Sequence, residues 1–254
     1  MDRNKSAYKL KDFGPLYIIN LDGQPERWKW MKDQLDYWQV TNYERISAFD
    51  GREDDLSEII SGRYPDAVSS GEVGCVTSHL KSIKHWYETT DTEYGIFMED
   101  DCDFCSVKHW PFSWREFMSR MPYDWDCLQI AIINPRRLIA NIHPRYVDDF
   151  STACFVVNRR YAEKLMHFHC RGDKFKLDNG VRPRAVADDL IYNAGRTYAI
   201  PLFLYKLELG SSIHPEHIDA FHKTSREGLD HWWTNQSADM PIDKFFEYDT
   251  HELY

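Results

Sequence analysis

The sequence predicts an α/β fold, in which helices flank a central sheet within a single domain. Short apolar runs alternate with longer segments whose apolar residues recur every three or four positions, as expected for strands alternating with amphipathic helices. The 254 residues suffice for one large domain, and 43% of them are hydrophobic, enough to fill a sizeable core. No internal repeat, low-complexity tract or linker divides the chain.

The first elements set the pattern for the others. The apolar run at 16–20 is typical of a strand buried on both faces. A helix is expected from Pro25, because proline is well placed at a helix start and apolar residues follow it at helical spacing. A second strand is predicted at 43–49. A strand, a helix and a second strand in this order open an α/β sheet.

The later elements follow the same alternation. A loop with a short helix is expected at 52–70, and a clear amphipathic helix at 72–87. Pro201, inside the last apolar run, favours an edge strand or a bulge there. The remaining predicted strands are 95–99, 126–133, 151–157 and 198–205, and the remaining helices are 159–170 and a short one at 190–195.

Composition and charge exclude some classes of function. The formal charge is -10, which disfavours a nucleic-acid partner bound by bulk electrostatics. No apolar run is long enough for a signal peptide or a membrane span, so we expect a cytoplasmic protein without a transmembrane anchor. The six scattered cysteines indicate reduced thiols, although Cys102 and Cys105 form a CxxC that leaves a zinc or redox site open.

An unusual group of acids follows the predicted strand at 95–99. Glu99, Asp100, Asp101 and Asp103 occupy four of five positions, and such close carboxylates repel one another. A divalent cation would offset this repulsion, and a site with few carboxylates would leave coordination positions for a diphosphate. The alternative is a solvated turn without a ligand.

Two further groups of polar residues are candidates. Ser78, His79 and Lys81 lie close together on the helix predicted at 72–87, where they form either a binding face or an ordinary solvated one. His79 could equally be a satisfied histidine where this helix contacts the sheet. Asp188 and Asp189 precede a short helix, where one of them could act as a general base. Aspartates at this position can equally cap the helix.

Near the C-terminus, histidines and aromatic residues give weaker signals. His214 could complete a metal site, with His217 and His222 as competitors, although a surface histidine is an alternative for each. The aromatic cluster at 231–233 could stack on an acceptor sugar or belong to the core.

Five motifs in sequence order carry a family resemblance. The segments IINLDGQPERW, YERISAFDG, GEVGCVTSHLKSI, FMEDD and VADDLI resemble the ordered motifs of glycosyltransferase family 25, over about residues 15 to 215. These are the lipopolysaccharide and collagen-type β-galactosyltransferases. The resemblance implies a glycosyltransferase A fold with a mixed central sheet, a nucleotide-sugar donor and a divalent cation, Mn²⁺ or Mg²⁺. It divides the chain into a tail at 1–14, the domain at 15–215 and a C-terminal extension at 216–254.

The resemblance also implies roles for particular residues. Asp101 would be the direct metal ligand and Asp100 would face the ribose, while Asp188 and Asp189 match a later acidic pair whose second member here is aspartate rather than glutamate. With the helix face added, the expected donor-binding residues are Asn20, Leu21, Arg27, Ala48, Asp50, Ser78, His79, Lys81, Glu99 and Asp100. The candidate metal ligands are Asp101, Asp103 and His214, and the candidate bases are Asp188 and Asp189.

The function predicted on this basis is a metal-dependent, inverting glycosyltransferase. It would move galactose or glucose from UDP-galactose or UDP-glucose to a hydroxyl of a glycan or a lipid-linked saccharide, as in lipopolysaccharide biosynthesis. Two alternatives belong to other classes. One is a metal-dependent nucleotide-sugar phosphohydrolase, and the other is a catalytically inactive carbohydrate-binding scaffold of the same fold.

Overall fold

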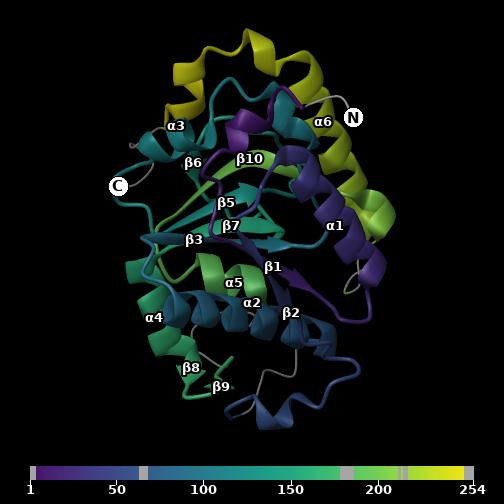
Figure 1. Ribbon diagram of the computed structural model, residues 1–254, viewed down its shortest axis with the longest axis vertical. Coiled ribbons are helices and arrows are strands. Elements are labelled where there is room, and N and C mark those ends of the chain that lie inside the picture. Colours follow the sequence, from purple (N-terminus) through teal and green to yellow (C-terminus); the bar gives the residue numbers. More distant parts are fainter. Residues whose placement is uncertain (1–3, 63–67, 178–185, 211–212, 214–216, 249–254) are drawn as a thin grey trace.

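The sheet forms the middle of three layers, with helices on both of its faces (Figure 1). This arrangement is seen in a computed structural model, which describes residues 4–62, 68–177, 186–210, 213 and 217–248. In Figure 1, α2, α4 and α5 lie below the sheet, and α1, α3 and α6 lie above it. The predicted α/β fold class is confirmed.

The strand order is β2-β1-β3-β7-β5-β10-β4, and β6 pairs with β10 beside this path. The strands are β1 (Leu16–Asn20), β2 (Tyr43–Ser47), β3 (Tyr94–Glu99), β4 (Cys102–Asp103), β5 (Cys127–Ala131), β6 (His143–Pro144), β7 (Cys154–Asn158) and β10 (Thr197–Tyr205), with β8 (Cys170–Arg171) and β9 (Lys174–Phe175) in a separate hairpin. The helices are α1 (Pro25–Trp38), α2 (Ser70–Thr89), α3 (Trp114–Ser119), α4 (Arg159–His169), α5 (Ala187–Tyr192) and α6 (Lys223–Asn235).

The sheet is mixed, as the family resemblance implies. β1 runs parallel to β2 and β3, whereas β7 runs antiparallel to both β3 and β5. The carboxyl ends of β1, β2 and β3 therefore meet at one edge. In open α/β sheets, ligands collect outside that edge.

Each face of the sheet has its own hydrophobic core. One contains Ile18, Met98 and Leu202 together with side chains of α1, α3 and α6, and the other contains Phe97 and Phe155 with side chains of α2, α4 and α5. Residues near both described ends of the chain also contribute to the cores, because Phe13 and Trp233 belong to the first one.

The bulge alternative for Pro201 is confirmed. The register of β10 against β5 shifts between Ala199 and Phe203. Pro201 therefore lies in the irregular part of this ladder, where regular pairing does not require the N–H that proline lacks. The carbonyl of Pro201 instead accepts a hydrogen bond from Nε1 of Trp233, at 2.9 Å. This bond ties α6 to the middle of strand β10.

Two further findings concern the chain as a whole. Within the ranges given above, no helix is long and apolar enough to cross a lipid bilayer. All six cysteines fall within those ranges, and each is a free thiol.

Candidate active site

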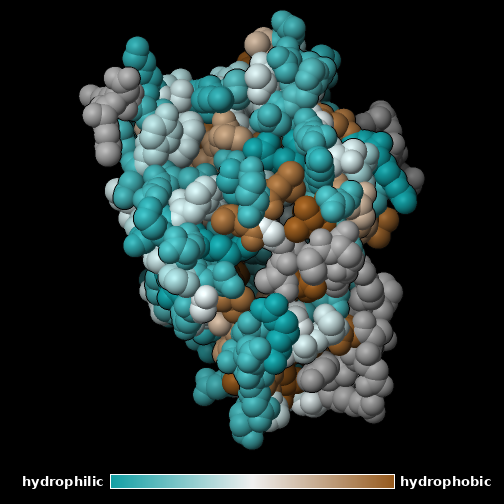
Figure 2. All heavy atoms as spheres, turned by 90° about the vertical axis from the view of Figure 1, so that its right-hand side faces the viewer, coloured by the Kyte–Doolittle hydropathy of each residue, from teal (hydrophilic) through white to brown (hydrophobic). Residues whose placement is uncertain are grey.

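Two adjoining cavities open at the carboxyl ends of the parallel strands. The smaller has a volume of about 290 Å³ and the larger about 520 Å³. Cys75, Glu99 and Ile213 line both of them. The larger cavity is bounded by residues 217–222, which lie on the right-hand side of Figure 1, the side that faces the viewer in Figure 2. Figure 2 shows hydrophobic side chains gathered near the middle of this face and hydrophilic ones around them.

The smaller cavity collects the expected donor-binding residues. Of those predicted, Asn20, Leu21, Arg27, Ala48, Asp50, Ser78, His79, Glu99 and Asp100 line it. Lys81 is the exception among them. Its Nζ donates to the carbonyl of Ser47 at 2.7 Å and lies 4.5 Å from the centre of the Phe49 ring. Lys81 therefore supports the chain after β2 rather than facing the cavity.

Helix α2 fixes one wall of this cavity. Its first turn is held by a capping box, in which Ser69 and Glu72 satisfy each other's backbone N–H groups. Nearly two turns further on, Oγ of Ser78 accepts a hydrogen bond from the backbone N–H of Phe49, at 2.8 Å. The side chain of Ser78 thus joins α2 to the loop after β2, where Ala48 and Asp50 line the cavity.

Arg27 links the acids to the opposite wall. Its Nη2 lies 2.5 Å from Oδ1 of Asp100 and 3.1 Å from Oδ2 of Asp101. Its Nη1 donates to the carbonyls of Leu209 and Gly210, at 3.0 and 3.2 Å. This guanidinium offsets the repulsion between two neighbouring carboxylates from within the protein itself.

Glu99 lies at the junction of the two cavities. Its Oε1 is 3.1 Å from Nε2 of His79 and accepts a hydrogen bond from Oγ1 of Thr152, at 2.8 Å. Burial by itself raises the pKa of Glu99, but the hydrogen bond and the charge of His79 outweigh it and leave that pKa below its ordinary value. Glu99 is therefore held as a carboxylate.

Asp101 is the acid with spare coordinating capacity. It lines the larger cavity, and its Oδ1 is buried with no hydrogen-bond partner among the residues described. Burial and the charge of Glu99 raise its pKa to about 7, although Arg27 opposes this. A buried carboxylate oxygen without a partner is a suitable ligand for a hard divalent cation that keeps water or phosphate oxygens as its other ligands. The site therefore fits the Mn²⁺ or Mg²⁺ that the resemblance implies.

Of the other two candidate metal ligands, Asp103 is not brought to Asp101. Asp103 accepts a hydrogen bond from the backbone N–H of Cys105 at 2.8 Å and pairs with Nη2 of Arg226 at 3.1 Å. Asp103 lines neither of the two cavities. His214 lies outside the described residues.

The two candidate bases have different surroundings. Asp188 lines the larger cavity, and its Oδ1 accepts a hydrogen bond from the backbone N–H of Ser151, at 2.8 Å. Its pKa is raised, mainly by burial, which makes this carboxylate a stronger base. Asp189 is buried outside the cavity, within 3.4 Å of Nδ2 of Asn193.

Both acids lie in the first turn of α5, and neither is its N-cap residue. The N-cap residue of α5 is Val186, which makes no side-chain capping bond. Asp188 binds the backbone of Ser151, in the segment before β7, instead of its own helix. Asp188 is thus held with its carboxylate in the wall of a cavity.

The aromatic residues of the larger cavity are not those expected from the sequence. Trp233 is buried in the core and Trp232 packs against that core, so the core alternative holds for these two residues, whereas His231 is exposed. The cavity is lined by Phe150, Tyr205 and Phe221, with His217 and His222 beside them. The rings of His217 and Phe221 are in tilted contact, with their centres 4.5 Å apart.

Sequence reasoning also missed Cys75 and Thr152. Cys75 stands four residues before His79 in the same helix, so their shared face was visible in the sequence. Thr152 had no such signal, because the pairing of β7 with β3 brings it to Glu99.

The mixed sheet, the flanking helices and the cavities at the strand ends are together consistent with a single-domain glycosyltransferase fold. Residues 13–110 match the sequence model of Glycosyltransferase family 25 (LPS biosynthesis protein). This match confirms the family resemblance over the segment that holds the first four motifs, and it supports a glycosyltransferase role. A comparison with curated proteins finds no match.

Proposed function

We propose that the chain is a metal-dependent, inverting hexosyltransferase. It moves galactose or glucose from a UDP-sugar to a hydroxyl of a glycan or a lipid-linked saccharide. The observation that carries this proposal is the pair of adjoining cavities. One is lined by the expected donor residues, and the other by Asp101 and Asp188. A donor in the first cavity would present its sugar at Glu99 to an acceptor in the second.

Asp188 is the proposed general base. A base must lie within hydrogen-bond reach of the acceptor hydroxyl, and Asp188 is the member of the acidic pair that lines the larger cavity. The hydrogen bond from Ser151 holds its Oδ1, so the other oxygen is the one we assign to the acceptor. Attack by that hydroxyl on the face opposite the nucleotide inverts an α-linked donor to a β-linked product.

Arg27 and Asp101 are the proposed groups at the leaving diphosphate. Arg27 lines the donor cavity, where its positive charge offsets the charge that grows on departing UDP. Asp101, through its buried Oδ1, would hold the divalent cation, which neutralises diphosphate oxygens when bound. Asn20 and Asp100 are assigned to the nucleoside side of the same cavity.

The experiment is a release assay with UDP-galactose and UDP-glucose, with and without saccharide acceptors. The family description points first to acceptors of the lipopolysaccharide type. We expect UDP release that requires Mn²⁺ or Mg²⁺, rises with acceptor and is accompanied by a glycosylated product. Asp101→Asn should remove most of this activity, and Asp36→Asn, at an exposed position of α1, is the matched control.

Two outcomes would contradict the proposal. Release of sugar phosphate without a glycosylated product would indicate the phosphohydrolase alternative. Full activity in the presence of a chelator, with Asp101→Asn equal to Asp36→Asn, would show that this carboxylate binds no catalytic cation.

A further inference from the structure

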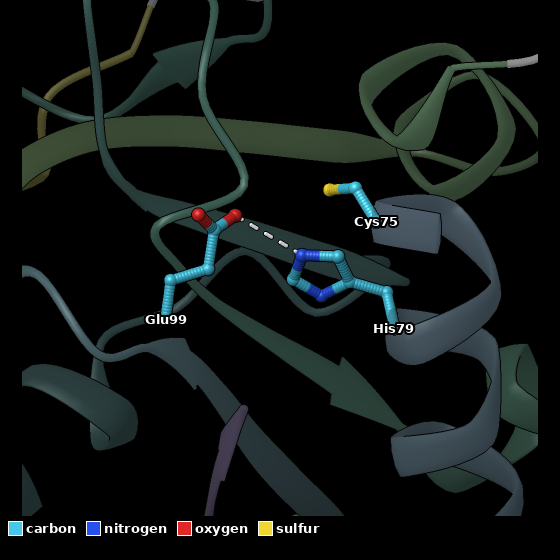
Figure 3. A group of neighbouring side chains, drawn as sticks. All are labelled: Cys75, His79 and Glu99. Carbon is cyan, nitrogen blue, oxygen red and sulfur yellow. Dashed lines mark hydrogen bonds and ion pairs between the residues drawn. The ribbon is translucent and has the colours of Figure 1, made fainter. Parts of the chain in front are cut away.

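Cys75, His79 and Glu99 form a compact group of three different metal-binding side chains (Figure 3). Cys75 and His79 project from successive turns of α2, and Glu99 comes from the end of β3. Their ligand atoms lie within 4.8 Å of one another, and Nε2 of His79 is 3.1 Å from Oε1 of Glu99. Figure 3 shows the sulfur directed toward the space between the carboxylate and the ring.

We propose that Cys75, His79 and Glu99 form a binding site for a thiophilic divalent cation, Zn²⁺ or its spectroscopic substitute Co²⁺. This site is distinct from the oxygen-only position assigned to Asp101.

The set of donor atoms selects the metal. A thiolate, an imidazole and a carboxylate are the three ligand types that Zn²⁺ uses in proteins. Mn²⁺ and Mg²⁺ prefer oxygen ligands, so a sulfur and a nitrogen out of three donors disfavour them. Three protein ligands leave a fourth tetrahedral position open. Because Cys75 and Glu99 line both cavities, that position is accessible to water or a small anion.

The helix holds two of the ligands nearly in place. Residues four apart share one face of a helix, and the capping box fixes the turn just before Cys75. His79 is fully buried, which restricts its ring. Zinc–ligand distances of about 2.0–2.3 Å place tetrahedral ligand atoms about 3.5 Å apart. Closing the group therefore requires a movement of about 1 Å, which rotation of the Cys75 side chain can supply.

Metal binding changes the protonation of Cys75 and His79. The Cys75 thiol loses its proton to solvent as the Zn–S bond forms. Nε2 of His79, which donates its proton to the Glu99 carboxylate in the metal-free chain, becomes the ligand atom, so this proton is also released to solvent and the ring keeps its proton on Nδ1. The hydrogen bond to Glu99 is replaced by two bonds to the metal, and Oγ1 of Thr152 still donates to Oε1 and orients this carboxylate.

The position of the site gives it a consequence for activity. A cation held by Cys75 and Glu99 lies at the junction of the cavities, where the transferred sugar would pass. Zn²⁺ is therefore expected to inhibit transfer. This consequence rests on the proposed function, whereas binding of the metal does not.

The test is a titration of the full, reduced and metal-free chain with Co²⁺, followed by absorption spectroscopy. We expect a near-ultraviolet thiolate-to-cobalt band in the unmodified chain and its loss when Zn²⁺ is added. Cys75→Ser should abolish the band, and His79→Gln should weaken Co²⁺ binding by at least about tenfold. Cys170→Ser, a half-buried thiol at the end of α4, is the matched control and should keep the band.

The proposal is overturned if the unmodified chain gives no such band or if the band persists in Cys75→Ser. Circular dichroism and thermal melting of each variant establish that the chain is folded. A cobalt band without any UDP release would leave this site standing and would contradict the proposed transferase. UDP release without a cobalt band would contradict this metal site and would leave the proposed transferase standing.

Discussion

At the scale of single residues, the acids after β3 are explained by their partners. Each contacts a protein group that offsets its charge and can donate a hydrogen bond to it. The pairs are Glu99 with His79, Asp100 and Asp101 with Arg27, and Asp103 with Arg226. One guanidinium thus serves two carboxylates. Arg27 and the proposed divalent cation would therefore act on the same charges.

The first residue-scale prediction is that Arg27→Gln lowers stability. The exposed fractions of the side chains of Arg27 and Asp100 are 12% and 8%, so the variant leaves buried carboxylates without their counter-charge. We expect a loss of about 3–5 kcal/mol in the free energy of unfolding, measured by denaturant titration. Because a bound cation would replace the lost charge, Mn²⁺ should raise the melting temperature of Arg27→Gln more than that of the unmodified chain.

The control for this variant is Lys29→Gln. Lys29 pairs with Asp33 on the exposed surface of α1, and such a pair contributes about 0–1 kcal/mol. Equal stability of Arg27→Gln and Lys29→Gln would contradict the proposed role of Arg27. An identical Mn²⁺ response in both would show that the cation and Arg27 act on different charges.

The second residue-scale prediction separates the two candidate bases. Because Asp188 lines the cavity and Asp189 does not, Asp188→Asn should slow turnover by about 10²–10⁴-fold at unchanged UDP affinity. The amide oxygen of asparagine can still accept the Ser151 hydrogen bond, so the melting temperature should change little. Asp189→Asn is the matched control. A larger loss of turnover in Asp189→Asn, measured by UDP release, would reverse the assignment.

At the scale of elements, α2 carries the motif GEVGCVTSHLKSI and holds it against the loop that forms part of the cavity wall. A Cβ at Gly74 would lie 2.5 Å from the backbone nitrogen of Gly51 and 2.7 Å from the carbonyl oxygen of Phe49. These are backbone atoms, which cannot rotate away. The helix can therefore approach the loop after β2 this closely only because residue 74 is glycine.

The element-scale prediction is that Gly74→Ala pushes α2 away from that loop. We expect a loss of about 1–3 kcal/mol from overpacking, together with weaker UDP binding because Phe49 and Asp50 line the donor cavity. Gly228→Ala in α6 is the matched control, because its Cβ would meet nothing within 4 Å. That helix should gain about 0.5–1 kcal/mol. Calorimetry with UDP would contradict the prediction if both variants bound it equally.

Many of the longer elements were predictable because local patterns determine them, but α3 and α6 were not expected from the sequence. The pairing of the strands was not predictable either. Periodicity located β1, α1, α2 and β3, but no local pattern showed that β7 runs antiparallel between β3 and β5. That pairing is what brings Thr152 to Glu99.

The same limit applies to the candidate site. Asp103 was predicted to be a metal ligand together with Asp101 because the two are only two positions apart in the sequence. Residues 102–103 pair with β10, however, and Asp103 contacts Arg226, more than a hundred residues further along the chain. The motif residues of the donor cavity were predictable because each follows a strand or lies on the helix that faces those strand ends. Lys81 shares that helix but has a side chain long enough to reach the backbone of Ser47.

At the scale of the whole molecule, both described ends of the chain belong to the core of the sheet. Phe13 contacts the rings of Trp114 and Phe203, with centres 4.8 and 5.5 Å apart. Trp233 stacks on Phe245 on the same side of the sheet. The C-terminal segment and the sheet therefore share one hydrophobic core, so we expect them to unfold together.

The whole-molecule prediction is that Trp233→Ala destabilises the entire chain in one transition. Trp233 is 1% exposed, and its indole donates to Pro201 at the bulge of β10. Removing it should cost about 3–5 kcal/mol, and the unfolding curves from far-ultraviolet circular dichroism and tryptophan fluorescence should still coincide. Tyr123→Ala, at a side chain that is 97% exposed, should change stability by less than about 0.5 kcal/mol. Two separate transitions in Trp233→Ala, with the sheet retaining its original midpoint, would show that residues 217–248 form an independent unit whose contact with β10 adds nothing to the stability of the domain.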